Sequence, residues 1–175
     1  MQIDKYGIKL RTVEVEDAEF ILSLRLNDKL GRYISPTTNN IEQQQDWIKK
    51  YKEREEKGFE YYFITIDDNG NKYGLNRIYD FDNNSFESGS WLFSPDAPKG
   101  YSILSDLAGR DYGFEAIGFE FCRFNVKKKN TTVINYNLAF KPEIISEDEF
   151  SLYFKIDYIS YKKHREHLLR MLIRK

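Results

Sequence analysis

The segment between residues 61 and 93 alternates apolar and polar side chains with a period of two, and this pattern constrains the fold most. It divides into runs at 61–67, 73–81 and 85–93, separated by Asp68-Asn69-Gly70-Asn71 and Asp82-Asn83-Asn84. A period of two places alternate side chains on one face of a strand, and asparagine, aspartate and glycine favour tight turns. Three strands with short connections predict an antiparallel meander.

Helical spacing of apolar residues marks the segments on both sides of the meander. Asp17 is predicted to cap a first helix, and Asn39 with Glu42 resembles a capping box for a second helix that runs to about Lys57. Gly118 is a predicted helix C-cap. The other expected elements are strands at 8–13, 120–126, near 144 and at 150–156, and helices at 101–117, 131–140 and 161–174. This order predicts a mixed α/β fold.

The size and charge of the chain exclude several classes of protein. A length of 175 residues suits one domain, predicted over 1–160 with a basic amphipathic helix over 161–175 packed on it. The formal charge of -1 argues against a nucleic-acid partner, and Cys122, the only cysteine, excludes an intramolecular disulfide. Neither a membrane-length apolar run nor a secretory leader is visible, so we expect a soluble cytoplasmic protein with no membrane partner.

A strand end, a loop with proline and glycine, and a helix start follow one another between Trp91 and Ser102. The first backbone N–H groups of a helix have no partner within it and, together with the helix dipole, favour an anion. Lys99 adds positive charge, and Gly100 lets a ligand approach the backbone closely. The same residues also suit a plain turn, so this junction is a candidate anion site whose alternative is a simple connection.

Several stretches resemble the GCN5-related N-acetyltransferase (GNAT) family. The run 124–136 resembles that family's strand, asparagine and helix segment, and 90–93 with the helix ending at 112–119 resembles the segment before it. Residues 9–11 and 17–18 resemble the family's first strand and helix. The likeness is closest to the branch of ribosomal-protein and nucleotide-sugar N-acetyltransferases.

This resemblance implies a GNAT-like fold with a central, mostly antiparallel twisted sheet, splayed at the cofactor slot and flanked by helices. It also implies acetyl-CoA as cosubstrate and no metal. The pantetheine arm would pair with backbone at Trp91, Leu92 and Phe93, and Asn130 would contact the same arm. The pyrophosphate would lie on the N–H groups near Lys99, Gly100, Tyr101 and Ser102.

The chain departs from the family pattern at two positions. Ala97 stands where the family's phosphate loop usually begins with glutamine or arginine. Asn137 stands where the family often has a tyrosine whose hydroxyl protonates the departing thiolate, and an asparagine cannot act as an acid. Tyr136 is therefore a candidate catalytic acid. Two alternatives stay open, that Tyr136 packs or contacts substrate, and that thiolate departure needs no protein acid.

Residues on the meander are candidates for the remaining chemistry, which requires a deprotonated amine. Glu87 is the candidate base because a partly buried carboxylate accepts a proton directly or through water, and Asp80 is a second carboxylate nearby. The alternative is that such carboxylates near turns only aid solubility. Arg77 and Tyr79 are candidate substrate-binding residues.

The residues and the resemblance together predict an acyl-CoA-dependent N-acetyltransferase that moves an acetyl group from acetyl-CoA to a primary amine by direct transfer in a ternary complex. The favoured acceptor is a small-molecule amine such as an amino sugar on a nucleotide carrier. Two alternatives stay open: a protein N-terminal acetyltransferase similar to those of ribosomal proteins, and a catalytically degenerate module that binds acyl-CoA. Ala97 and Asn137 favour the second alternative. The sequence is compatible with a monomer and with a homodimer.

Overall fold

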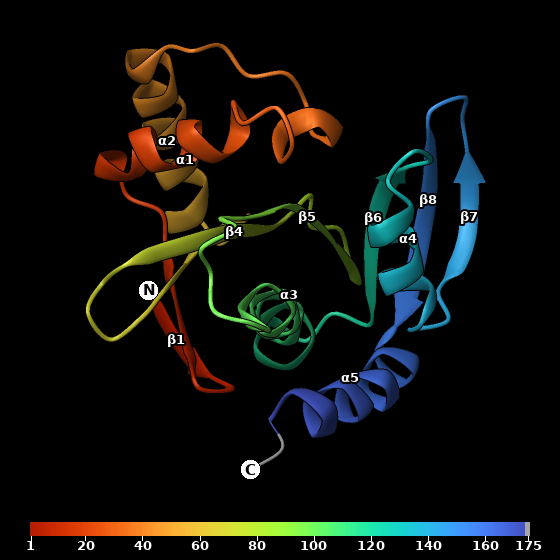
Figure 1. The fold of residues 1–175 in the computed structure, drawn as a ribbon. Helices are drawn as coiled ribbons and strands as arrows, with labels where there is room; N and C mark the ends of the chain where they lie inside the picture. Colours follow the sequence, from red (N-terminus) through yellow and green to blue (C-terminus); the bar gives the residue numbers. More distant parts are fainter. Residues whose placement is uncertain (174–175) are drawn as a thin grey trace.

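Within residues 1–173, which the computed structural model describes, the strands form one eight-stranded sheet (Figure 1). The sheet order is β1-β2-β3-β4-β5-β6-β8-β7, and neighbouring strands are antiparallel except β5 and β6, which are parallel. This confirms the predicted mixed, mostly antiparallel sheet. The strands are β1 Gln2–Lys5, β2 Ile8–Thr12, β3 Tyr61–Ile66, β4 Lys72–Tyr79, β5 Ser85–Phe93, β6 Phe121–Lys127, β7 Glu143–Glu147 and β8 Ser151–Asp157.

Helices cover both faces of the sheet. In Figure 1, α1 and α2 lie on one face at β4 and β5, α3 lies on the opposite face, and α4 lies beside β6. After α3 the chain continues as a π-helical turn, Tyr112–Ile117, and Gly118 ends this turn with φ at 96°, which confirms the predicted C-cap. The helices are α1 Ala18–Arg25, α2 Ile41–Glu56, α3 Tyr101–Asp111, α4 Thr131–Leu138 and α5 Tyr158–Leu172.

Alternate residues of β3 belong to two different apolar clusters. Tyr62 and Ile64 are buried with Ile21 of α1, whereas Phe63 is buried with Leu107 of α3. Successive side chains of a strand point to opposite faces, so the sheet separates two cores. The period of two in the sequence corresponds to these two faces, and β3, β4 and β5 form the predicted meander.

The first strand has no signal in the sequence. Residues 2–5 are mostly polar, and their pairing with β2 is set by a tight turn at Tyr6 and Gly7, where φ is 60° and 76°. Left-handed backbone at both turn residues matches the right-handed twist of the two strands. The turn, and not apolar alternation, therefore creates β1.

Two helices begin elsewhere than predicted because a neighbouring residue caps them. Asn40 caps α2 by accepting a hydrogen bond from the N–H of Gln43 at 2.8 Å, so the predicted cap at Asn39 is wrong. Asp157 caps α5 by accepting from the N–H of Ser160 at 2.9 Å, and α5 begins directly after it, three residues before the predicted start at 161. The predicted end of this helix at 174 lies outside the described residues.

Asp17 precedes α1 as predicted, but its carboxylate does not cap the helix. It is 1% exposed and accepts hydrogen bonds from Arg11 Nη1 at 2.6 Å, Arg11 Nη2 at 2.8 Å and the backbone N–H of Glu14 at 2.8 Å. Lys72 of β4 forms an ion pair with it at 2.6 Å. Burial alone would raise the pKa of Asp17, but these donors outweigh it and lower the pKa to about 2. Asp17 therefore ties β2 and β4 to the start of α1.

We predict that Asp17→Asn lowers the free energy of unfolding by about 2 kcal/mol at pH 7, because about 1.4 kcal/mol accompanies each pKa unit. A lowered pKa contributes stability above the unfolded-state value and loses it below the folded-state value. The difference between the two proteins should therefore shrink as the pH falls from about 4 and disappear near pH 2. Urea unfolding at several pH values measures this, with the exposed Glu19→Gln as control. A difference that does not change with pH would contradict the prediction.

Candidate functional site

β5 and β6 are parallel neighbours that pair only where they begin. Residues 85–87 face residues 121–123, and from Ser88 onward the two strands part. A cavity of about 120 Å³, called here the slot, lies between them and is closed by α3 and α4. The splay of the sheet that the resemblance implied is thereby confirmed. The slot is lined by Leu30, Tyr33, Ile34, residues 88–92, Asp106, Arg110, residues 124–127, Asn130, Val133 and Asn137.

A bulge shapes β5 beside the slot. The register of β4 with β5 shifts between Leu75 and Arg77, so that Asn76 faces both Ser90 and Trp91. Ser90 has a positive φ of 51°, which a residue other than glycine rarely adopts. Bulges bend a strand and end regular pairing. Because β6 does not pair with this part of β5, the free backbone groups of β5 can pair with an extended ligand as with an added strand.

The start of α3 lies just beyond β5. Gly100 precedes the helix with φ at 90°, and the Nε1–H of Trp91 donates to the carbonyl of Ser102 at 2.9 Å, which fixes this start against β5. The N–H of Tyr101 donates to Pro98 at 3.1 Å, whereas the next N–H groups, at Ser102 and Ile103, have no acceptor within a regular helix. Lys99 is exposed at the same place. These groups can hold an anion next to the slot.

A buried polar network lies on the α3 side of the slot. The Nε–H of Arg110 donates to Asp106 at 3.1 Å, and its Nη2–H donates to Asn137 at 2.9 Å. Burial acts to lower the pKa of Arg110, but Asp106 raises it, so the guanidinium stays charged. Arg110 and Asp106 are missed by the sequence analysis, since opposite charges four residues apart on a helix usually form a surface pair. Their only signal is that both lie within the helix predicted at 101–117.

Tyr136 is tied to this network and is not among the residues that line the slot. Its hydroxyl donates to Asp106 at 2.7 Å, and its ring lies 5.1 Å from that of Trp91 and 5.4 Å from that of Phe140. Burial and the Asp106 carboxylate raise the pKa of Tyr136 well above its usual value. A hydroxyl with a raised pKa gives up its proton less readily. Its part as a catalytic acid stays a prediction.

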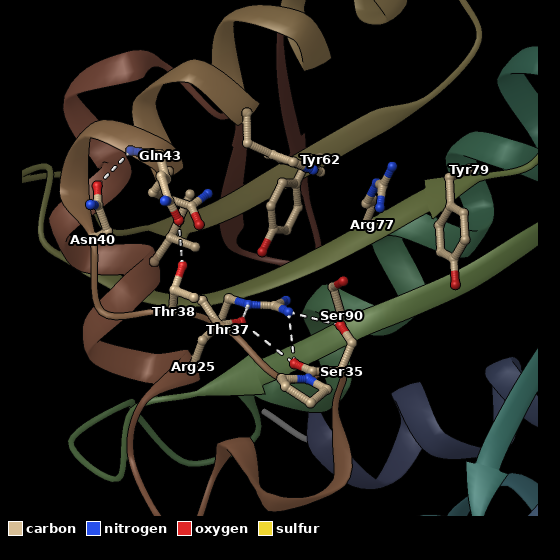
Figure 2. Close-up of a pocket in the computed structure, with 14 residues that line it drawn as sticks. Arg25, Ser35, Thr37, Thr38, Asn40, Gln43, Tyr62, Arg77, Tyr79 and Ser90 are labelled. Atoms are coloured by element: carbon tan, nitrogen blue, oxygen red, sulfur yellow. Dashed lines mark hydrogen bonds between the residues drawn. The ribbon is translucent and has the colours of Figure 1, made fainter.

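A second cavity of about 470 Å³, called here the α1/α2 cavity, lies on the other face of the sheet (Figure 2). The loop 35–38 forms one wall, and Arg25 holds it by donating to Thr37 Oγ1 at 2.6 Å and to Ser35 Oγ at 3.0 Å. Figure 2 shows the hydroxyl of Tyr62 pointing into the cavity. Ser90 lines both this cavity and the slot, so the two spaces meet at the β5 bulge.

Arg77 and Tyr79, the predicted substrate-binding residues, both line the α1/α2 cavity. The Nε–H of Arg77 donates to the buried carboxylate of Glu60 at 2.6 Å, and its guanidinium lies 4.5 Å from the ring centre of Tyr79 and 5.2 Å from that of Trp47. Arg77 is thus held in place from three sides. Trp47, Arg25 and the 35–38 loop have no local signal in the sequence, because they reach the cavity from a separate pair of helices.

Glu87 lies where β5 and β6 begin to part. Its carboxylate accepts hydrogen bonds from the hydroxyl of Tyr79 at 2.8 Å and from Asn125 Nδ2 at 3.0 Å. Glu87 is therefore connected to the α1/α2 cavity through Tyr79. The second carboxylate, Asp80, is exposed and pairs with Arg123 away from both cavities.

The predicted residues are thus distributed over two neighbouring places. Trp91, Leu92 and Asn130 line the slot, whereas Phe93 packs over Gly74 of β4 and is not part of the lining. Residues 99–102 lie at the start of α3, outside the slot cavity itself. No cluster of histidine, cysteine, aspartate or glutamate suited to a metal ion occurs within residues 1–173. Over the same residues no helix has the length and apolar character needed to cross a bilayer.

A splayed sheet, an unpaired strand edge and a helix start with free N–H groups are the features that the resemblance to the GNAT family implied. Residues 8–135 match the family model of the acetyltransferase (GNAT) domain, and the chain belongs to this family of N-acetyltransferases. The family uses acetyl-CoA as cosubstrate, as the resemblance implied.

Solved structures extend this finding. The apo structure of FdhC, a nucleotide-linked sugar GNAT, is 39% identical, with 98% of each chain covered and a TM-score of 0.86. Ribosomal-protein-S5-alanine acetyltransferase from Vibrio fischeri is 14% identical, with 90% of this chain and 96% of that chain covered and a TM-score of 0.75. Spermidine N-acetyltransferase from Vibrio cholerae, in complex with CoA and spermine, is 17% identical, with 89% and 98% covered and a TM-score of 0.73. The last two show likeness of fold. No curated protein matches the chain.

Proposed function

We propose that this N-acetyltransferase moves an acetyl group from acetyl-CoA to the amine of an amino sugar carried on a nucleotide, by direct transfer in a ternary complex. The observation that carries the proposal is the lining of the α1/α2 cavity, which contains Arg25 and Arg77 and, among the described residues, no carboxylate. Arg77 shares the Glu60 carboxylate with Arg54, so positive charge still exceeds negative charge at the cavity, and this suits the phosphates of a nucleotide carrier. A polyamine or a protein N-terminus would be better matched by acidic residues.

The remaining lining of the α1/α2 cavity supports a sugar. Hydroxyl and amide side chains from Thr38, Asn40 and Gln43 provide hydrogen-bond donors and acceptors for sugar hydroxyls. The rings of Trp47 and Tyr79 provide flat apolar faces. Identity of 39% over 98% of both chains with FdhC, a nucleotide-linked sugar GNAT, gives independent support.

The slot has the chemistry that acetyl-CoA requires. We propose that the pantetheine arm pairs with the β5 edge at Trp91, Leu92 and Phe93, that Asn130 contacts the same arm, and that the pyrophosphate lies at residues 99–102. The parted strands supply unpaired backbone, and the start of α3 supplies N–H groups. The missing basic or amide residue at Ala97 leaves Lys99 and the backbone as the phosphate donors.

Gly100→Val is expected to weaken CoA binding by about tenfold or more, because a β-branched residue disfavours a φ of 90° and covers the backbone at the proposed phosphate site. Calorimetric titration with CoA measures the dissociation constant. Gly70→Val is the matched control, since Gly70 has a φ of 82° in the turn between β3 and β4, with open space around it. Equal affinities of the two folded variants would contradict the placement of the pyrophosphate.

Deprotonation of the acceptor amine is assigned to Glu87. The hydroxyl of Tyr79 lines the α1/α2 cavity and donates to Glu87, so the amine proton can reach the carboxylate through this hydroxyl. Tyr79 has a raised pKa, chiefly through burial and the nearby Glu87 charge, and thus stays protonated at neutral pH. The pair can therefore move a proton without separating charge inside the cavity.

Glu87→Gln is expected to lower turnover by about 100-fold, the usual effect of losing a general base, while CoA affinity stays within about twofold. Steady-state kinetics and calorimetry test this, with Asp80→Asn as the control carboxylate away from the cavities. If the two variants were equally active, Glu87 would not be the base.

An acceptor panel tests the function itself. Release of free thiol from acetyl-CoA is followed with a nucleotide-linked amino sugar, the same amino sugar without its nucleotide, spermidine, and a peptide with N-terminal alanine. The nucleotide-linked sugar should show a kcat/KM about 100-fold above the free sugar, since two charge-assisted contacts to phosphate, from the half-buried Arg25 and Arg77, are each worth about 1.5 kcal/mol. Preference for spermidine or the peptide would reject the proposed acceptor. Binding of CoA with no thiol release on any amine would favour the degenerate module.

A further inference from the structure

Arg110 holds a buried hydrogen-bond donor that has no acceptor in the described part of the chain. Its side chain is 3% exposed and lines the slot. Nε and Nη2 have acceptors in Asp106 and Asn137, whereas Nη1 has none within residues 1–173. An unpartnered donor on a buried charged group is costly, so its retention calls for a ligand atom that accepts from it.

Arg110 lies beside the slot as one half of a buried ion pair, and the other groups around it are neutral. Asp106 is the carboxylate bound to it, and this carboxylate also accepts from Tyr136. The other titratable groups near it, Cys122 of β6 and Tyr161 of α5, are neutral, because burial raises the pKa of Cys122 to about 12 and that of Tyr161 well above its usual value. The rings of Phe124 and Phe140 pack on the guanidinium, and their centres lie 4.9 Å and 5.5 Å from it. A hydrogen bond from the unpartnered Nη1–H to an anion is therefore stronger in this buried setting than it would be in water.

Arg110 and the α1/α2 cavity, where the acceptor amine is proposed to bind, lie on opposite sides of the sheet. α3 lies on the other face of the sheet from α1 and α2 (Figure 1). The preceding residue, Gly109, packs against Asn76, where a Cβ would come within 3.0 Å of its side chain, and Asn76 faces the bulge at Ser90. The two cavities meet at this bulge. An amine arriving from the α1/α2 cavity therefore attacks from one side, and Arg110 lies on the other.

We propose that the Nη1–H of Arg110 donates to the sulfur of CoA and stabilises the thiolate as it departs. This inference rests on the proposed placement of CoA in the slot. In the transfer, a bond forms between the amine nitrogen and the acetyl carbon, and the carbon–sulfur bond breaks with its electron pair going to sulfur. Arg110 keeps its proton, and its Nη1–H stabilises the new negative charge through a hydrogen bond. The amine proton leaves through Tyr79 to Glu87, so this step needs no protein acid at Asn137.

The binary complex with CoA tests the proposal without turnover. A cation beside the sulfur lowers the pKa of the bound thiol, so CoA should bind more tightly as the pH rises, by about tenfold for each unit by which that pKa is lowered. Desulfo-CoA, which lacks the thiol, corrects for every other pH-dependent group. Calorimetric dissociation constants for both ligands between pH 6.5 and 9.5 give the ratio that reports on the thiol alone. For the wild type, we expect the dissociation constant of CoA relative to that of desulfo-CoA to fall by about tenfold between pH 6.5 and 9.5.

The variant is Arg110→Met combined with Asp106→Asn, which removes the cation without leaving a buried carboxylate unpaired. For this double variant, we expect the ratio of the two dissociation constants to stay nearly constant between pH 6.5 and 9.5. Tyr136→Phe removes a hydroxyl from the same network, and Arg123→Gln removes an arginine from β6 outside the slot; both should keep the wild-type ratio. Thermal unfolding followed by circular dichroism shows that each variant is folded.

The outcomes separate the two levels of inference. If wild-type protein binds CoA and desulfo-CoA with the same pH dependence, the proposal for Arg110 is overturned while the slot assignment stands. The proposal is also overturned if the folded double variant keeps the pH dependence of the ratio. If Tyr136→Phe loses this pH dependence, Tyr136 and not Arg110 contacts the CoA sulfur. If neither ligand binds the wild type, the proposed function fails first.

Discussion

The parting of two parallel strands, β5 and β6, determines where everything else in the site can lie. Parallel neighbours need a crossover, and α3 with its π-helical turn is that crossover. The helix can lie close beneath the sheet because Gly109 and Gly113, four residues apart, meet Asn76 and Phe86 directly: a Cβ at Gly113 would come within 2.6 Å of the Phe86 ring. This close approach presents Arg110 to the slot and places the start of α3 beside the end of β5.

Much of this fold is readable from the sequence wherever local pattern and tertiary environment agree. The meander follows from alternation and turns, and Gly118 from the need for a left-handed residue after a helix. β1 could not be found this way, because the Tyr6-Gly7 turn creates it without an apolar face. Asn39 and Asn40 are adjacent residues of equal capping propensity, and the backbone of the preceding loop decides between them.

The residues of the candidate site likewise fall into those that local sequence pattern identifies and those that it does not. Trp91, Asn130, Arg77 and Tyr79 lie on segments whose strand or helix character the sequence shows, and the structure places them on the lining of a cavity. Residues contributed from a distance have no such signal. Arg25, Trp47 and Tyr62 converge only when α1 and α2 pack on the sheet, and Arg110 is a charge that local pattern would assign to the surface. Sequence patterns report which face of an element is apolar, whereas a polar site depends on which faces meet.

The two cavities share Ser90 at the bulge, and both also draw on the segment 21–47. Within that segment, Leu30, Tyr33 and Ile34 line the slot, whereas the lining residues between 35 and 47 belong to the α1/α2 cavity alone. Under the proposed function, substitutions within residues 35–47 would alter the surface offered to the acceptor and leave the lining of the slot unchanged. A new acceptor preference can then arise from one short stretch of the gene, without a change to the residues that are proposed to hold the acyl donor.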